Sequence, residues 1–191
     1  MIRCYEPRDA PLIKESIDSS LEHLRDWMPW AAGEPQTLAE KTELARHFRS
    51  SFDSGENFTY GIFGADERAL LGGTGLHPRI GPGGLEIGYW VRASATRQGI
   101  ATESSAALSR VGLEVCEADR IEIRIEPRNE ASKGVPRKLG FTEEATLRRR
   151  LYARKGGPLR DVTIFTLFRE DFEPSMARDI RAFDARGEQI L

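Results

Sequence analysis

The segment from residue 85 to residue 139 constrains the fold more than any other, because strand and helix patterns alternate in it. Leu85–Val91 is an apolar run typical of a strand, and Ile100–Val115 has helical spacing of its apolar residues. Arg120–Glu126 alternates strictly, with isoleucine at every second position, and Ala131–Leu139 is again helical. Two strands joined by a helix of this length are parallel and connected by a right-handed crossover. The sequence therefore predicts a parallel strand pair with the first helix packed on the sheet.

The remaining strand patterns predict antiparallel partners for this unit. They cover Ile2–Tyr5, Phe58–Phe63 and Leu70–Leu76, and the last two lead into the parallel pair as a meander. Thr146–Tyr152 and Val162–Phe168 surround the turn segment ARKGGPLR and predict a hairpin. The prediction is an α/β fold whose mixed, mostly antiparallel sheet has about six or seven strands.

Two helices are predicted before most of the sheet. Asp9 is a candidate N-cap of the first, whose apolar residues keep helical spacing: Leu12, Ile13, Ile17, Leu21 and Leu24. Thr37 and Glu40 form a capping box that opens the second, with three apolar residues facing inward: Leu44, Phe48 and Phe52. Residues 1–191 are expected to form a single domain. Its charged C-terminal extension, residues 170–191, has Ile180 and Phe183 as candidate anchors of a short helix.

Composition excludes several classes of protein. Of the 191 residues, 39% are apolar and 30% are charged, and no window approaches the roughly 18 consecutive apolar residues of a membrane span. A formal net charge of −2 gives no general attraction to nucleic acid, and the N-terminus lacks a secretory signal. We therefore expect a cytoplasmic protein without a membrane or nucleic acid partner. Cys4 and Cys116 are expected to be reduced and buried, and the spacing of the histidines predicts no metal site.

A glycine-containing loop leads from the strand at Leu85–Val91 directly into the next helix. A helix N-terminus presents unpaired N–H groups and a partial positive charge, which together bind phosphate. Gly99 lets the backbone approach a phosphate closely, Ala101 is small, and Arg97 adds a positive charge. Taken alone, the segment is equally consistent with an ordinary strand-to-helix turn.

The loop and the later segment EPRNEASKGVPRKLGF give the chain its most informative resemblance. Together they resemble the GNAT acetyltransferase superfamily, in particular its RimJ and RimL branch of N-terminal-amine acetyltransferases. The resemblance extends over nearly the whole chain, through EIGYWV, RQGIATES, IEIRIEP and the RDV of the last strand. It implies helices on both faces of a sheet that is splayed open between Leu85–Val91 and Arg120–Glu126. It also implies acetyl-CoA as co-substrate in that opening, without a metal, and it leaves a homodimer open.

The resemblance assigns coenzyme contacts to particular positions. The backbone near Val91 would bind the pantetheine amides, and Asn129 would contact the coenzyme on its other side. The pyrophosphate would lie on a loop of consecutive residues: Arg97, Gln98, Gly99, Ile100, Ala101 and Thr102.

Three positions depart from the family pattern. Thr96 stands at the first place of the loop motif, so the side-chain contact expected there falls to Arg97. Many relatives have a tyrosine acid where this chain has Pro136, and some have a glutamate base where it has Arg124. The proton-transfer groups of this chain must therefore come from other residues.

Ser132 and Glu86 are the candidate catalytic residues. In the RimJ and RimL branch, a serine three residues after the asparagine is a candidate acid for the departing thiolate, and Ser132 has this position. A helix-start serine that satisfies backbone N–H groups is the alternative. Glu86 shares a strand face with Gly88 and Trp90, so it is a candidate base whose pKa an indole neighbour would raise. A glutamate that reaches solvent at the strand start is the alternative.

Four residues are candidates for binding the acceptor. Trp27 and Trp30 lie in a loop that resembles the aromatic wall of the acceptor pocket, and core packing is the alternative. Tyr152 and Asp161 are predicted to face each other across the last hairpin, either completing the pocket or making an ordinary cross-strand contact.

The weak base candidates favour an acceptor that loses its proton easily. A peptide α-amine with a pKa near about 8 is roughly a tenth neutral at pH 7, whereas a lysine amine is neutral only about once in two thousand. The sequence therefore predicts an acetyl-CoA-dependent N-acetyltransferase in which a primary amine, the N-terminus of a protein or peptide, attacks the thioester directly. Two alternatives remain: acetylation of a small amine such as an antibiotic, polyamine or aminoacyl conjugate, and a non-catalytic acyl-CoA-binding module.

Overall fold

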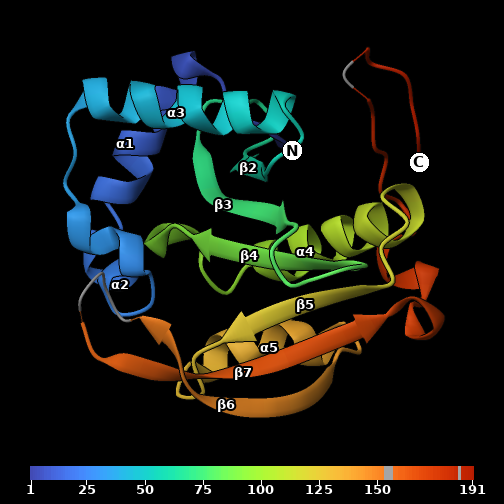
Figure 1. Cartoon of the computed structure of the whole chain (residues 1–191). Coiled ribbons are helices and arrows are strands. Elements are labelled where there is room, and N and C mark those ends of the chain that lie inside the picture. The colour runs from blue at the N-terminus through green and yellow to red at the C-terminus, as the bar shows by residue number, and fades with distance from the viewer. Residues whose placement is uncertain (153–156, 185) are drawn as a thin grey trace.

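The computed structural model, which describes residues 1–152, 157–184 and 186–191, contains one seven-stranded mixed sheet (Figure 1). The strand order is β1-β2-β3-β4-β5-β7-β6, and the neighbours pair antiparallel except for β4 and β5. The strands are β1 Ile2–Cys4, β2 Phe58–Phe63, β3 Leu70–His77, β4 Gly84–Val91, β5 Arg120–Ile125, β6 Thr142–Tyr152 and β7 Leu159–Phe168. The predicted sheet is confirmed, and β6 and β7 are longer than the sequence pattern indicated.

The parallel pair is joined through α4 (Ile100–Arg110), which continues as a wider π-type turn over Val111–Val115. Within the described chain, the β4–β5 ladder runs from Gly84 and Arg120 to Glu86 and Glu122 and stops there. Both strands continue beyond this point, and they diverge in Figure 1. The predicted crossover and the predicted opening of the sheet are confirmed.

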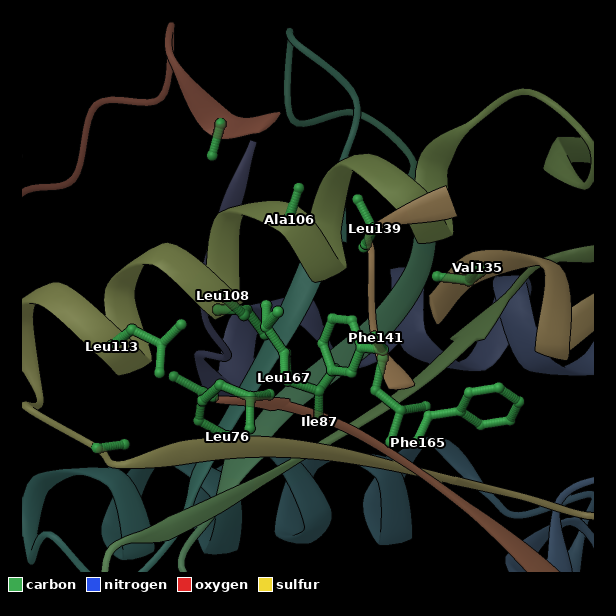
Figure 2. Packing of buried hydrophobic residues seen from close by; sticks show 14 of the residues in the cluster. Leu76, Ile87, Ala106, Leu108, Leu113, Val135, Leu139, Phe141, Phe165 and Leu167 are labelled. Atoms are coloured by element: carbon green, nitrogen blue, oxygen red, sulfur yellow. The ribbon is translucent and has the colours of Figure 1, made fainter. Parts of the chain in front are cut away.

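Two hydrophobic clusters lie on opposite faces of the sheet. One contains Leu76 and Ile87 and packs against α4 and α5 (Glu130–Lys138), as Figure 2 shows for Leu108 of α4 and its strand neighbours. The other forms under α1 (Ala10–Asp18), α2 (Leu21–Arg25) and α3 (Leu38–Asp53), and Trp90 packs against it. Because successive residues of a strand point to opposite faces, Ile87 and Trp90 belong to different sides of β4. Helices therefore cover both faces.

The first predicted helix is divided in two, because α1 ends at Asp18 and α2 begins at Leu21. The sequence predicted that Asp9 caps α1, but its side chain makes no cap hydrogen bond. Its carboxylate instead accepts from the Glu6 N–H at 2.8 Å and binds the Arg3 guanidinium at 2.7 and 2.9 Å. A short 3-10 turn, Pro7–Asp9, consequently precedes the helix.

The capping box at the start of α3 is confirmed. The Glu40 N–H donates to Thr37 Oγ1 at 3.2 Å, and the Thr37 N–H donates to Glu40 Oε2 at 2.7 Å. Leu44, Phe48 and Phe52 are half-buried.

The C-terminal extension forms 3-10 turns at Arg169–Asp171 and Pro174–Ala177 rather than the predicted short helix. Ile180 packs against the core, as expected of an anchor, but Phe183 is 55% exposed and belongs to an isolated bridge with Gln189. The turn predicted between β6 and β7 falls partly on residues 153–156, which lie outside the described part of the chain.

Both cysteines are free thiols among the described residues, but the predicted burial is wrong for Cys116, which is exposed at the end of the π-type turn. Cys4 is half-buried. None of the described helices is both long enough and apolar enough to span a bilayer.

A buried ion pair that sequence reasoning missed joins α3 to the segment before it. Lys41 is 0% exposed, and its Nζ contacts Oε1 of Glu34, whose Oε2 accepts from the Gln36 N–H at 2.9 Å. A buried charge without its partner is strongly destabilising, whereas the intact pair contributes little compared with apolar residues of similar volume.

We predict that Glu34→Gln lowers the free energy of unfolding by about 3 kcal/mol, because it leaves the Lys41 ammonium buried without a counter-charge. The double variant Glu34→Gln with Lys41→Met should recover most of this loss. Urea unfolding monitored by tryptophan fluorescence measures both. The control is Glu43→Gln, which removes an exposed partner of Arg46 and should change stability by less than about 0.5 kcal/mol. Equal effects of the two single changes would contradict the prediction.

Candidate active site

The loop before α4 has the geometry of an anion-binding helix start. Gly99 precedes the helix in the left-handed conformation with φ +85°, and Arg97 is left-handed as well with φ +62°. The first amide groups of a helix have no carbonyl four residues earlier to bind, so those of Ile100, Ala101 and Thr102 are available to a ligand. Arg97, Gln98 and Gly99 are exposed.

The positive φ at position 99 explains why this loop has a glycine there. A β-branched residue at position 99 would be strained at φ +85°, and its Cβ would lie 3.4 Å from the Glu103 carboxylate. Gln98 donates to the Ser94 carbonyl at 3.2 Å, and Thr96 Oγ1 donates to the Ala93 carbonyl at 3.0 Å. These bonds fix the loop without using the first N–H groups of α4, which remain available to a ligand.

Ser132 and Asn129 are brought together at the start of α5. The Asn129 side chain is the N-cap, since its Oδ1 accepts from the Ser132 N–H at 3.1 Å. The alternative in which Ser132 caps the helix is therefore wrong, and its hydroxyl is 2.9 Å from the Tyr89 hydroxyl.

Tyr89 reaches Ser132 from β4, across the opening of the sheet. Its hydroxyl also donates to the Ser132 carbonyl at 3.1 Å, and burial raises the pKa of Tyr89 to about 12. The tyrosine keeps its proton at neutral pH, and it links β4 to the helix opposite. Sequence reasoning missed this residue because the family tyrosine was sought on α5, where Pro136 stands.

Glu86 lies in an arginine network rather than in the surroundings predicted for it. Arg79 donates to its two oxygens at 2.5 and 3.1 Å, and Arg124 Nε is 3.8 Å away. Glu122, its partner in the last rung of the parallel ladder, binds Arg120 and Arg124 at 3.0 Å. Glu86 is 8% exposed, so the alternative of a solvent-facing glutamate is wrong, and its partners are cations rather than an indole.

A cleft of about 630 Å³ lies beside this network; it borders the face of β3 and β4 that α1 to α3 cover and, past the end of the parallel ladder, also Tyr89 and the start of α5. Its lining is largely apolar and includes Trp27, Trp30, Trp90, Glu86 and Ser132. Trp30 is 41% exposed and meets Trp90 edge to face at 5.9 Å, while the Arg128 guanidinium lies 4.9 Å over Trp27. Both tryptophans of the loop therefore border the cleft, and Trp30 is not a core residue.

The two candidates on the last hairpin do not face each other. Tyr152 pairs with Leu159 and is 58% exposed, whereas the Asp161 carboxylate accepts from the Arg149 N–H at 2.9 Å. Leu151 pairs with Arg160 and Tyr152 with Leu159, so the register does not bring Tyr152 opposite Asp161, and Leu151 rather than Tyr152 borders the cleft.

His77 and Asn57 also line the cleft, and sequence reasoning did not single them out. His77 Nδ1 is 2.6 Å from Asn57 Oδ1. Burial and the neighbouring Arg79 lower the pKa of His77 to about 4, with Glu86 acting in the opposite direction. Its position on β3, opposite Glu86, was a usable signal.

The sheet opened between two parallel strands, with a helix start at one end of the opening, and the family comparison together place this chain among the acetyltransferases. The chain belongs to the acetyltransferase (GNAT) domain family, whose model matches residues 1–142, and it is an N-acetyltransferase. Among the described residues, no three His, Cys, Asp or Glu side chains gather as they would around a metal ion.

Known relatives agree with this assignment. The chain is 26% identical over 174 residues to YdaF of Bacillus subtilis (strain 168), which has a provisional name as a ribosomal N-acetyltransferase; the match covers 90% of this chain and 92% of YdaF. The fold is similar to RimJ of Mycobacterium smegmatis, solved with a CoA disulfide (26% identity, TM-score 0.81, 93% of this chain and 85% of that one). It is also similar to RimL, a ribosomal L7/L12 alpha-N-protein acetyltransferase solved with coenzyme A (22%, 0.78, 89% and 94%).

We predict that Gly99→Val raises the dissociation constant for acetyl-CoA at least tenfold, equivalent to about 1.4 kcal/mol. The left-handed backbone resists a β-branched residue, and the side chain would occupy the space where a phosphate approaches the α4 amides. Isothermal titration calorimetry measures the change. Gly187→Val is the matched control, because Gly187 has φ +80° with open space around it in the C-terminal extension. Unchanged affinity in a folded Gly99→Val protein would exclude this loop as the pyrophosphate site.

Proposed function

We propose that the enzyme acetylates the N-terminal α-amine of a protein or peptide with acetyl-CoA as co-substrate. The observation that carries this proposal is that the carboxylates of the cleft are paired with cations of the protein. Its described acidic lining residues, Glu34, Glu86 and Glu126, are each bound by a cationic side chain of the protein. An acceptor with several positive charges, such as a polyamine or an aminoglycoside, therefore finds no free carboxylate there.

The ion pairs around the cleft leave a surplus of arginine. Glu126 contacts Arg128 and binds Arg160 at 2.6 Å, and Arg79 and Arg124 both line the cleft beside Glu86. Such a surface disfavours a lysine side chain, which is almost always charged at neutral pH, more than an α-amine, of which roughly a tenth is neutral. The name of RimL, an alpha-N-protein acetyltransferase, supports the same acceptor class.

The residues present fit acetyl-CoA as a substrate. The open amides at Ile100–Thr102 and the Arg97 guanidinium suit a pyrophosphate, and the strand backbone near Val91, past the end of the parallel ladder, suits the amides of pantetheine. Gln98, Gly99 and Asn129 complete the proposed coenzyme surface. When bound, acetyl-CoA supplies an activated acyl group that an amine can attack without a covalent enzyme intermediate.

Four side chains have the remaining roles in this proposal. Trp27 and Trp30 enclose the first residue of the acceptor, because aromatic side chains provide large rigid contact area. Ser132, hydrogen-bonded to Tyr89, donates a proton toward the departing thiolate. Glu86 holds Arg79 and Arg124 at the base of the opening, a positioning role rather than the proton transfer first considered for it.

The direct test compares two short peptides of the same sequence. One has a free N-terminus with a small first residue and no lysine; the other has a blocked N-terminus and one free lysine. We predict that the first is acetylated at least about a hundredfold faster at pH 7, because the neutral-amine populations differ by a factor on the order of a few hundred. Mass spectrometry after incubation with acetyl-CoA measures both rates.

Two variants connect the result to the cleft. Trp30→Ala should raise KM for the peptide and leave acetyl-CoA affinity unchanged, since it removes only acceptor contacts. Phe183→Ala is the control, an exposed aromatic of the C-terminal extension. Equal labelling of the two peptides, or labelling of neither beside rapid acetylation of a small amine, would contradict the proposed acceptor.

A further inference from the structure

We propose that His77 is the catalytic base of this enzyme and takes the proton from the acceptor amine through Nε2. The inference rests on the proposed function, because it assigns a proton acceptor to the amine acetylation described above. It is independent of the coenzyme loop and of Trp27 and Trp30.

The position of the imidazole is set by two glycines on neighbouring strands. Gly75 and Gly88 form a cross-strand pair, and His77 lies two residues along β3 on the same face. A Cβ built on Gly75 would lie 2.7 Å from His77 Nε2, and one built on Gly88 would lie 3.4 Å from it. The ring therefore lies against the bare backbone of Gly75, where any other residue would displace it, and next to Gly88.

This bare floor coincides with the place where the sheet opens. Gly88 is two residues beyond Glu86, the last residue of β4 in the parallel ladder. Trp90 borders the floor on the other side, with its indole against Gly73. An amine that enters the cleft between the two rings reaches the opening over Gly88, next to Nε2.

The contact with Asn57 determines which ring nitrogen is free. Asn57 Oδ1 is a carbonyl oxygen and can only accept, so His77 Nδ1 donates the 2.6 Å hydrogen bond. A neutral imidazole has one N–H, which leaves a lone pair on Nε2. Asn57 is itself held at the start of β2, because its backbone N–H donates to the Ser51 carbonyl at 3.2 Å.

Burial, together with the neighbouring Arg79, keeps this lone pair available by lowering the pKa of His77, while Glu86 acts in the opposite direction. Arg79 follows it on the chain, Glu86 lies opposite on β4, and Arg79 binds Glu86 directly. Because the pKa of His77 is lowered to about 4, the ring is neutral throughout the pH range in which an α-amine loses its proton. Protonation of His77 therefore does not limit the rate above about pH 5.

The step balances as a single acyl transfer. The neutral amine forms a bond from nitrogen to the acyl carbon, which makes that nitrogen cationic and more acidic than the parent ammonium ion. His77 Nε2 takes one proton from it, and the C–S bond breaks with its electron pair going to sulfur. The thiolate takes one proton from the Ser132 hydroxyl, which regains one from solvent, and His77 releases its own proton to solvent. A base that is weak toward a free ammonium ion thus suffices for the adduct.

The test replaces His77 and supplies the missing base from solution. His77→Ala should lower kcat for the free-N-terminus peptide at least about a hundredfold and leave the acetyl-CoA dissociation constant within about twofold. Added imidazole should restore turnover, and a series of substituted imidazoles should restore it more effectively as their pKa rises. His47→Ala, which changes an exposed histidine of α3, is the matched control.

A second measurement covers the case in which the alanine variant does not fold. The ¹⁵N shifts of His77 in the wild-type protein should show a neutral ring with its proton on Nδ1 at pH 6. A proton on Nε2, full activity of folded His77→Ala, or loss of activity that no imidazole restores would each overturn the assignment. If the wild type acetylates neither peptide, the proposed function fails. His77→Ala is then compared with the wild type on a small amine whose acetylation releases the thiol of coenzyme A.

Discussion

The structure depends on the point where two glutamates face each other and the sheet opens. Glu86 and Glu122 form the last rung of the only parallel pair among the described strands, and like charges placed opposite each other destabilise a sheet. Arg79, Arg120 and Arg124 neutralise them from the loop after β3 and from β5 itself. The network closes the base of the opening, and beyond it the strand backbone is left for a ligand to satisfy.

The opening between β4 and β5 brings two different sets of groups to one cleft, because successive residues of β4 point to opposite faces of the sheet. Tyr89 points to the side of α5 and joins Ser132, whereas Trp90 points into the cleft that His77 also lines. The proposed reaction uses this arrangement. Ser132, which protonates the thiolate, lies on the α5 side of β4, and His77, which takes the amine proton, lies on the acceptor side. The two proton transfers therefore do not compete.

The parts of the fold that follow from periodicity could be predicted from the sequence. The change from period-two to helical spacing at residues 85–139 fixed the crossover, and Thr37 with Glu40 marked the start of α3 because both capping partners are local. Side chains with distant partners were not accessible in this way. The arginines around Glu86 come from separate segments, and the register that pairs Tyr152 with Leu159 rather than with Asp161 leaves no mark in an alternating pattern.

In the proposed complex, acetyl-CoA occupies the opening between β4 and β5 and lies on the loop before α4. Backbone amide hydrogen exchange with and without acetyl-CoA tests it most directly, since each amide reports its own protection. We predict that acetyl-CoA slows exchange by at least about tenfold at the amides of Ile87–Val91 that face β5 and at those of residues 97–102. Amides of Gly84–Glu86, already within the ladder, should change little. Unchanged exchange at the opening and the loop in the saturated protein would show that acetyl-CoA does not bind there.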